Sequence, residues 1–374
     1  MNKKQVLGLM ATSLFLTGCV GLDNLSSQSS GDQKTSENTV TVQSTTNQLS
    51  NDYYRALIID GKYQPSQSRG VSLSLNSGFN MRNFETGLIG LSRNIFPTSQ
   101  YFFQEGQILN TATINSWINR TSDTNPEGLN PAATGDAAGA GRTPYYLAQI
   151  LEQDYMIQTE NNFELGGISI GLAMNSVDYY TANDVNLHQE ISDETLQEQG
   201  KAMANTILTR LRQNDALKSV PIVFGIFKQT SEDDIGGGTY VLEATSIEGT
   251  QVSEWIPRNN KIVVLPLLEG DPTEESIAFE NFRSEVQNFF PNLSGVTARV
   301  NYSDNVAKKM VVSVMTQFYG ESEIIALTQH VTDVANKYLP KAVPVEVRIS
   351  SINGMEAFLM QDMEKGVFTY HVFD

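Results

Sequence analysis

A single cysteine, Cys19, is the feature that most restricts how this chain of 374 residues can fold. With one thiol the chain cannot form an internal disulfide, and it cannot bind zinc through a group of thiolates. The segment after residue 50 has a length that is usual for two domains or for one duplicated domain. The folded part is therefore expected to hold together without disulfides or a thiolate metal site.

Cys19 follows a short apolar segment close to the N-terminus. Met1–Lys4 is basic, Val6–Thr17 is largely apolar, and Leu16-Thr17-Gly18 directly precedes the cysteine. The apolar run is shorter than the ~20 residues that cross a bilayer as a helix, and it fits the h-region of a secretory signal. The stretch Leu16–Cys19 resembles the lipobox of bacterial lipoproteins. In that pattern the signal is cut before the cysteine, and a diacylglycerol is joined to its sulfur by a thioether.

The lipobox predicts that residues 1–18 are a signal peptide and that Cys19 is the lipidation site. Leu16, Thr17 and Gly18 are the predicted cleavage signal. Attachment through two acyl chains is stable, whereas one chain gives weak and reversible binding. The implied partners are the lipid bilayer, through the acyl chains on Cys19, and the enzymes that process lipoproteins. The expected location is the outer face of the bacterial cytoplasmic membrane, with no other segment spanning it.

The charge of the chain excludes some partners. The formal net charge is −17, and residues 1–18 carry Lys3 and Lys4 but no acidic residue, so the processed chain is more acidic still. Nucleic-acid binding requires patches of Lys and Arg that neutralise phosphates. The sequence therefore predicts no nucleic-acid partner and no broad electrostatic contact with anionic lipid.

The segment that follows the cysteine differs in composition from the rest of the chain. Val20–Ser50 is rich in Ser, Thr, Asn, Gln and Asp and has few large apolar residues. Such a composition does not bury enough surface to fold. Residues 19–50 are therefore predicted to form a flexible tether that spans roughly 30 Å on average.

Apolar periodicity after residue 50 predicts an α+β fold with an internal duplication. A strand over 71–75 and a helix over 80–96, capped by Asn80, are expected near its start. A helix–strand–helix–strand pattern then occurs twice, and in each copy the last strand follows a Val-Pro pair. The expected elements are 145–156, 165–175, a helix from Ser192 or Asp193, and 220–224 in the first copy, and 276–290, 293–303, 321–338 and 343–347 in the second.

Two features complicate this duplication. An additional strand is expected at Met310–Met315 in the second copy, and chance similarity between two ordinary α+β segments is the alternative explanation. The junction is expected at Glu232–Tyr240, where three consecutive glycines indicate a turn or linker. We therefore divide the folded part into a first repeat, 51–234, and a second repeat, 235–374.

A search for catalytic and metal-binding motifs gives no catalytic residue, no metal site and no cofactor. His188, His330 and His371 have no metal-ligand spacing, and no G-x-S-x-G motif occurs. The loop "GDAAGAGRT" has the wrong spacing for a phosphate-binding loop and carries Arg142 where that motif has lysine. Acidic pairs such as Glu274-Glu275 are explained by helix starts.

One small ligand site is suggested by the start of the folded part. Arg69 and Arg82 lie among Asn and Ser residues and are candidates for binding a small anion. Salt-bridged surface arginines are the alternative interpretation.

Several longer stretches resemble one known family. They are "SNDYYRALIIDGKYQPSQSRGVSLSLNSGFNMRNFETGLIGLSRNIFPTSQYFFQEGQIL", "GGISIGLAMNSVDYY", "VPIVFGIFKQ" and "FFPNLSGVTARVNY". Together with the lipobox they resemble the CamS lipoproteins of low-GC Gram-positive bacteria, which are described as sex-pheromone precursors. The resemblance implies a duplicated α+β fold and a hydrophobic peptide that is released from the signal and acts in conjugative plasmid transfer. The corresponding peptide here is Thr12, Ser13, Leu14, Phe15, Leu16, Thr17 and Gly18.

The folded part is expected to have a non-catalytic binding role. Two alternatives remain open at this point. One is a substrate-binding lipoprotein for the uptake of peptides or sugars. The other is an extracytoplasmic cell-wall hydrolase, which would need two carboxylates facing each other across a cleft.

Overall fold

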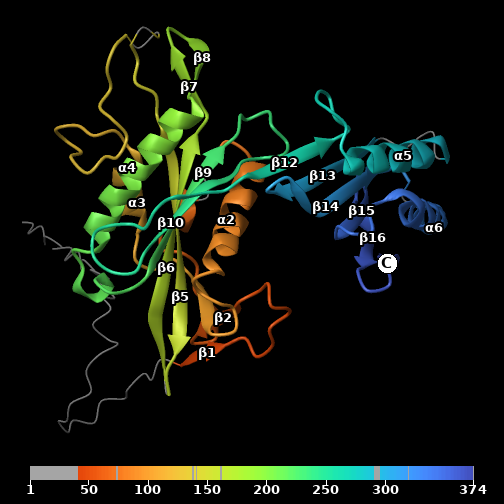
Figure 1. Cartoon of the computed structure of the whole chain (residues 1–374), viewed down its shortest axis with the longest axis horizontal. Coiled ribbons are helices and arrows are strands. Elements are labelled where there is room, and N and C mark those ends of the chain that lie inside the picture. The colour runs from red at the N-terminus through yellow and green to blue at the C-terminus, as the bar shows by residue number, and fades with distance from the viewer. Residues whose placement is uncertain are drawn as a thin grey trace, which may run out of the picture. The chain divides into compact units, whose positions relative to one another are not determined.

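The computed structural model describes residues 41–72, 75–136, 139, 141–160, 162–289, 295–318 and 320–373. Helices and strands alternate irregularly along the chain, so the predicted α+β class is confirmed (Figure 1). Among the described residues, the strands form a nine-stranded sheet, a six-stranded sheet and a two-stranded hairpin. Cys19, the cleavage signal and the pheromone-equivalent peptide lie outside the described residues.

The first sheet is built by the larger, N-terminal part of the fold. Its strands are β1 (Val42–Ser44), β2 (Arg55–Ile59), β3 (Lys62–Tyr63), β4 (Tyr101–Glu105), β5 (Leu147–Gln158), β6 (Phe163–Asn175), β9 (Ile222–Gln229), β10 (Thr239–Ser246) and β11 (Ile256–Pro257). They follow the order β1-β2-β4-β5-β6-β9-β10-β11, with β3 beside β2. The hairpin of β7 (Val177–Ala182) and β8 (Val185–Glu190) follows β6.

Helices cover both faces of this sheet. They are α1 (Arg69–Ser72), α2 (Gly78–Ser92), α3 (Thr111–Ile118) and α4 (Asp193–Leu211). On one face, Trp117 of α3 and Ile207 of α4 join the core formed with Phe224. On the other face, Phe84 and Leu88 of α2 pack with residues of β9 and β10. Apolar side chains on both sides of the central strands explain why these strands are almost completely buried.

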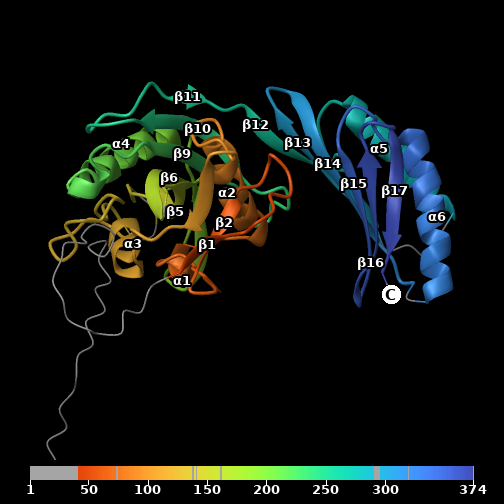
Figure 2. The ribbon, with the colours of Figure 1, turned by 90° about the horizontal axis from the view of Figure 1, so that it is seen from below.

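The second sheet has helices on one face. Its strands are β12 (Asn260–Leu265), β13 (Gly295–Ser303), β14 (Val306–Met315), β15 (Val345–Ser351), β16 (Gly354–Asp362) and β17 (Val367–Val372), which pair in that order. The helices α5 (Glu274–Phe289) and α6 (Glu321–Tyr338) lie on the same side (Figure 2). Buried positions alternate strictly with partly buried or exposed ones along β13 and β15, which follows from this one-sided cover.

The two sheets contain the same series of elements. The series β4-α3-β5-β6-α4-β9-β10-β11 corresponds to β12-α5-β13-β14-α6-β15-β16-β17. In each series the third and fourth strands are parallel, and their neighbours are antiparallel. The Val-Pro pairs also match, because the amide of Ile168 donates to the Pro221 carbonyl at 3.0 Å and that of Met310 donates to Pro344 at 2.9 Å. The structure thus contains the duplication that the sequence suggests.

The strand equivalences differ from the predicted ones. Residues 145–156 are predicted to be helical, but this stretch contributes most of β5. Strand β6 pairs parallel with β9, and β14 pairs parallel with β15, so β14 is the counterpart of β6. The predicted match of 165–175 with 293–303 is therefore wrong, because 293–303 corresponds to β13, the strand before β14. Residues 71 and 72 belong to α1 and not to a strand.

Some boundaries also move. Helix α2 begins at Gly78 with Ser77 as its N-cap, since the Ser77 hydroxyl accepts the amide of Asn80, and it ends at Ser92 and not at 96. Strand β1 lies inside the segment predicted as a tether and pairs with β2, so the folded part begins before residue 50. Strand β10 pairs with β9, so the first sheet continues past the expected boundary at 234/235 and ends at β11.

The duplicated parts differ in how their sheets are covered. Helix α2 closes the second face of the first sheet, whereas the equivalent face of the second sheet, which we call the open face, has no helix within the described residues. The open face carries the side chains that alternate with the core positions, including Arg299, Lys309 and Arg348. No helix in the part of the chain that the structure describes has the length and apolar character needed to cross a membrane.

Candidate functional site

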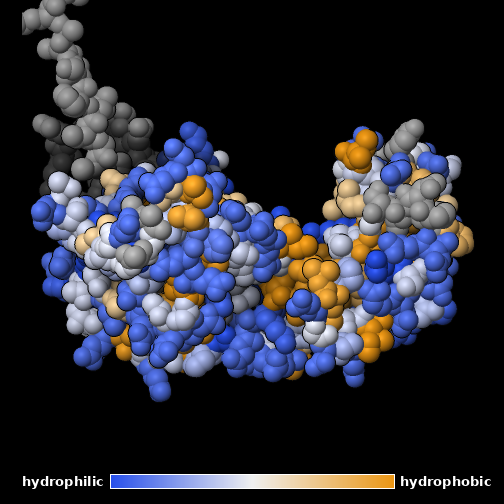
Figure 3. All heavy atoms as spheres, turned by 90° about the horizontal axis from the view of Figure 1, so that it is seen from above, coloured by the Kyte–Doolittle hydropathy of each residue, from blue (hydrophilic) through white to orange (hydrophobic). Residues whose placement is uncertain are grey.

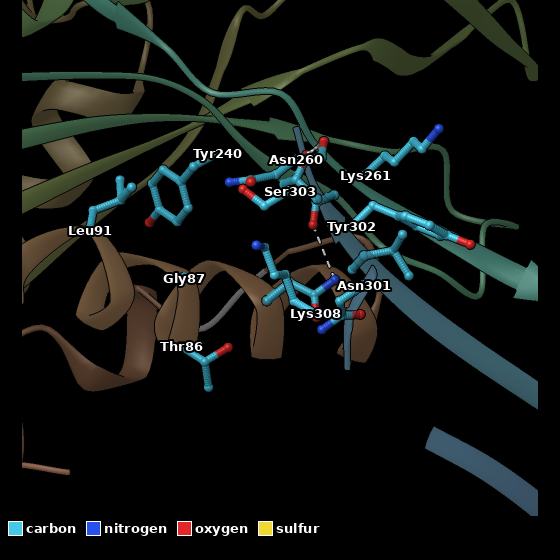
Figure 4. A pocket seen from close by; sticks show the side chains of 14 residues that line it. Thr86, Gly87, Leu91, Tyr240, Asn260, Lys261, Asn301, Tyr302, Ser303 and Lys308 are labelled. Carbon is cyan, nitrogen blue, oxygen red and sulfur yellow. Dashed lines mark hydrogen bonds between the residues drawn. The ribbon is translucent and has the colours of Figure 1, made fainter. Parts of the chain in front are cut away.

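A cavity of about 310 Å³ lies beside the open face. It is lined by residues of α2, β10, β12 and β13 and by Lys308 at the start of β14. Figure 4 shows Tyr240 and Leu91 on one side of the cavity and Asn260, Ser303 and Lys308 on the other. The walls therefore come from both sheets and from the helix that covers the first one.

The lining combines polar and apolar groups and lacks negative charge. Amides and hydroxyls are supplied by Asn83, Thr86, Asn260, Asn301 and Ser303. Lys261 and Lys308 are the cations, and none of the described residues that line the cavity is Asp or Glu. The whole chain has 42 acidic and 25 basic residues, so the sign of charge at this cavity is opposite to that of the protein.

The two lysines point in different directions. The Lys261 ammonium lies 5.2 Å from the centroid of the Tyr302 ring, and both side chains extend away from the cavity (Figure 4). The Tyr302 hydroxyl donates to Glu275 at 2.9 Å, on the side of the sheet that carries α5. Lys308 is thus the lysine that the cavity presents to a ligand.

The position of Lys308 follows from an irregularity in the β13–β14 pairing. Asp304 and Asn305 have φ angles of 51° and 61°, as in the tight hairpin turns that favour Asp and Asn. Tyr302 then pairs with Ala307, but Asn301 pairs with Lys309, so Lys308 is the extra residue of a β-bulge. A bulge redirects a side chain that regular alternation would send to the opposite face. This places Lys308 beside the cavity and leaves Lys309 on the open face.

Arg299 adjoins the cavity through Asn83. The Arg299 guanidinium donates to the Gly236 carbonyl at 2.5 Å and to Asn83 Oδ1 at 3.4 Å, and it lies 5.0 Å from the centroid of the Phe79 ring. Its Nε is buried and has no hydrogen-bond partner among the described residues. Burial lowers the pKa of Arg299, the nearby charge of Arg82 lowers it further, and Asp234 acts in the opposite direction.

An ionic network continues along the open face. Glu346 accepts hydrogen bonds from Lys309 and, at 3.0 Å, from Arg348. Burial opposes ionisation of Glu346, but these two cations outweigh it and lower the pKa of the carboxyl group. Arg299, Lys309 and Arg348 therefore give the open face an excess of positive charge over Glu346.

Apolar side chains also reach solvent on the second sheet. Met360 is 52% exposed and Val367 is 45% exposed, both at positions that alternate with the core. The face of the molecule drawn in Figure 3 is mostly hydrophilic, with several separate apolar patches. The open face is thus mixed in character, with charged side chains on β13, β14 and β15 and exposed apolar ones on β16 and β17.

The two arginines predicted as a ligand site have different neighbours. Arg69 lies 3.6 Å from Glu105, so it takes part in a surface ion pair. Arg82 is exposed on α2 and lies within electrostatic reach of Arg299. Of the predicted pair, Arg82 alone is therefore near the cavity.

Other singled-out residues have structural roles. Asp234 Oδ1 accepts the amides of Gly236 and Gly237 at 2.6 and 3.1 Å, which fixes the glycine-rich turn. The ring of His330 stacks on Phe289 at 4.0 Å, and His188 lies beside Tyr179. Within the described residues, no group of three or more His, Cys, Asp and Glu is arranged to hold a metal ion.

A buried carboxylate pair, Glu152 and Asp154, is absent from the residues predicted above. Glu152 accepts the amides of Ile108 and Leu109 at 2.9 and 2.6 Å, and Asp154 accepts that of Gln107 at 2.9 Å. The sequence contains a pattern that predicts this pair, because two acidic residues separated by one residue lie on the same face of a strand. Reading the segment as helical conceals this.

A second hollow, of about 750 Å³, lies beside Arg212. The guanidinium of Arg212 is buried and donates to the carbonyls of Leu217, Val220, Ser246 and Gly249. All of these contacts hold segments of the chain together. Arg212 therefore serves the fold, and the cavity beside Lys308 is the better candidate for a ligand.

Comparison with known proteins identifies the family. Residues 63–366 match the sequence profile described as CamS sex pheromone cAM373 precursor. The crystal structure of a sex pheromone precursor from Lactobacillus salivarius subsp. salivarius is 39% identical, with a TM-score of 0.85, and the match covers 89% of this chain and 99% of that one. The C-terminal domain of the sex pheromone staph-cAM373 precursor from Staphylococcus aureus is 33% identical, with a TM-score of 0.66 and coverage of 81% and 99%. No curated protein matches the chain. The profile match and the identity to the first structure together show that the chain belongs to the CamS family of sex pheromone precursors.

Proposed function

We propose that the protein is a lipid-anchored precursor whose signal segment yields a short pheromone peptide, and whose folded part binds a ligand without catalysis. The observation that carries this proposal is the sequence Leu16-Thr17-Gly18-Cys19 after a short apolar run, in a chain of the CamS family. Acyl chains on Cys19 would hold the folded part at the outer face of the cytoplasmic membrane.

The peptide and the anchor arise from the same processing in this proposal. Cleavage between Gly18 and Cys19 frees the signal segment, and a second cut before Thr12 leaves Thr12–Gly18, "TSLFLTG". The folded part remains attached through Cys19. This division of roles explains why a precursor of a short peptide carries a large folded part that the peptide does not need.

A binding role for the folded part is supported by its cavity. The cavity beside Lys308 joins polar amides to an accessible cation. The buried pair Glu152 and Asp154 gives no comparable support to a hydrolase, because both carboxyl groups hold the backbone of residues 107–109. We therefore favour binding over hydrolysis.

The test is Cys19→Ala, expressed at normal levels in the native host. Without the thiol no thioether forms, so we expect an unprocessed N-terminus, loss of the acyl mass, and loss of "TSLFLTG" from the medium. Mass spectrometry of the protein and of the medium measures all three. Synthetic "TSLFLTG" added to cells that carry a responsive plasmid should restore transfer.

Two results would count against the proposal. A Cys19→Ala protein that stays with membranes after alkaline washing and carries a normally cut N-terminus would exclude the anchor. A synthetic peptide that leaves plasmid transfer unchanged at micromolar concentration would exclude the pheromone role, even if the anchor is present.

A further inference from the structure

The cavity beside Lys308 is positively charged in a strongly acidic protein. Lys308 forms no ion pair within the described part of the chain, and the other lining residues are neutral except Lys261, which points away from the cavity. A cation without a carboxylate partner attracts anions, and walls of low dielectric strengthen that attraction. The surrounding acidic surface makes an accidental anion site at this position less expected, because most of the molecule repels anions.

A second cation stands next to the cavity. Arg299 contacts Asn83, which lines the cavity, and Arg82 and Arg348 lie within its electrostatic range. Three guanidinium groups this close repel one another unless anions are near. Asp234 offsets part of this repulsion at Arg299, and Glu346 pairs with Lys309 and Arg348. Neither carboxylate lines the cavity, so an anionic ligand there would add a favourable contact with Lys308 that these residues do not supply.

We propose that this cavity binds a ligand that carries a phosphate or carboxylate group on a polar, hydrogen-bonding body. Lys308 contacts the anionic group, Arg299 attracts it from behind Asn83, and Asn260, Asn301 and Ser303 bind the polar body. The inference rests on the binding role proposed above and names the class of ligand for it.

The duplication argues against an apolar occupant of the neighbouring open face. Equivalent strand registers place Ser313 and Arg348 in the second sheet where the first sheet has Gly171 and Gly225. The two glycines allow the close approach of Tyr240, Phe84 and Leu91 beneath α2. An apolar helix docked in the same way on the open face would bury Arg348, Lys309 and Glu346, whose desolvation is costly. A polar, charged ligand avoids this cost.

The experiment measures binding to the purified full-length protein by calorimetry. Inorganic phosphate, glucose 6-phosphate and glucose are the free probes. Vesicles of phosphatidylcholine with phosphatidylglycerol test a lipid headgroup as the source of the anion. The vesicle measurement uses the Cys19→Ala protein with and without Lys308→Gln, because the lipid anchor would otherwise mask binding. Both proteins keep the signal segment, so its contribution to vesicle binding is the same in the two.

Lys308→Gln is the diagnostic variant, and Lys62→Gln is its control. Both remove one positive charge from an exposed lysine, but Lys62 lies on β3, away from the cavity lining. We expect glucose 6-phosphate or the anionic vesicles to bind, and Lys308→Gln to weaken that binding at least about tenfold. Lys62→Gln should leave the affinity unchanged.

Each result decides between supporting and overturning the inference. Binding of free sugar phosphate that depends on Lys308 supports it with a soluble ligand. Binding of anionic vesicles alone, if it also depends on Lys308, supports it with a lipid headgroup. Equal affinities in Lys308→Gln and Lys62→Gln overturn it, as does the absence of saturable binding to every anionic probe. Binding of glucose that Lys308→Gln leaves intact overturns the anionic class but keeps the binding role.

Discussion

At the scale of single residues, Glu152 and Asp154 are the most unusual groups in the first sheet. They are 2% exposed each, yet both can carry a charge. Burial raises the pKa of both carboxyl groups, and the charge of Glu152 raises that of Asp154 further. Backbone amides of 107–109 favour the ionised form of Glu152. Burial and the neighbouring charge of Glu152 therefore favour the protonated form of Asp154.

This arrangement predicts a dependence of stability on pH. Asp154 holds its proton in the folded protein to a higher pH than in the unfolded chain, where the Asp pKa is about 3.9. Its contribution to stability is complete below about pH 3.9 and is lost as pH rises through the raised pKa. Asp154→Asn removes this titration and keeps an oxygen that can accept the amide of Gln107. We expect the free energy of unfolding to fall less between pH 5 and pH 8 in the variant, by up to ~1.4 kcal/mol per pH unit.

Urea unfolding at four pH values measures this difference. Asp304→Asn is the control, because Asp304 is exposed in the turn between β13 and β14 and its loss changes the net charge equally. Parallel pH profiles for the parent and Asp154→Asn would mean that Asp154 has the same pKa in the folded and unfolded states.

At the scale of elements, helix α6 and strand β15 of the second sheet are easier to predict than strand β5 of the first. Helix α6 and strand β15 are covered on one side, so their apolar residues recur with clear periods of 3.6 and 2. Strand β5 is buried on both faces, and its residues Leu147, Ile150, Leu151 and Tyr155 happen to have helical spacing. Packing against β4, β6 and α2 makes this segment a strand, and those elements lie elsewhere in the sequence.

Equivalent positions in the two sheets also differ in how much space the covering elements leave for a side chain. A Cβ atom on Gly171 would lie 2.6 Å from the Tyr240 hydroxyl and 2.8 Å from a ring atom of Phe84. Tyr240 is 2% exposed and donates to the Phe84 carbonyl, so it cannot move aside easily. Gly171→Val should therefore lower the free energy of unfolding by about 1–3 kcal/mol through overpacking.

Ser313→Val is the matched variant in the second sheet. Ser313 occupies the register of Gly171, but its side chain faces the open face, where no helix lies in the described part of the chain. Its replacement should change the free energy of unfolding by less than about 0.5 kcal/mol. Urea denaturation of both variants checks this, and equal losses in the two would contradict the proposed difference in cover.

At the scale of the whole molecule, the sequence predicts more about processing and class than about the site. The lipobox and the repeated Val-Pro pairs are local patterns, so both can be read without a structure. The cavity depends on the bulge at Lys308 and on Asn83, which come from segments far apart in the chain. Alternation along β13 does place Arg299 and Asn301 on one polar face, but it does not show that α2 lies nearby. The site follows from the arrangement of the two sheets, which single segments do not encode.

The duplication predicts that the second sheet and its two helices fold independently of the first sheet. The core of the second sheet is made by residues between Leu265 and Phe368, and it does not share a member with the cores of the first sheet. A fragment of residues 258–374 keeps every strand of that sheet and both of its helices. We expect it to unfold in one cooperative transition, with an enthalpy of about 60–80 kcal/mol per 100 residues. A shorter fragment, 267–374, lacks β12 and Leu265 and leaves β13 as an unpaired edge, so it should unfold at a lower temperature. Calorimetry and near-ultraviolet circular dichroism compare the two. If 258–374 shows no cooperative transition, the second sheet depends on the first for its fold, and the repeats are not independent folding units.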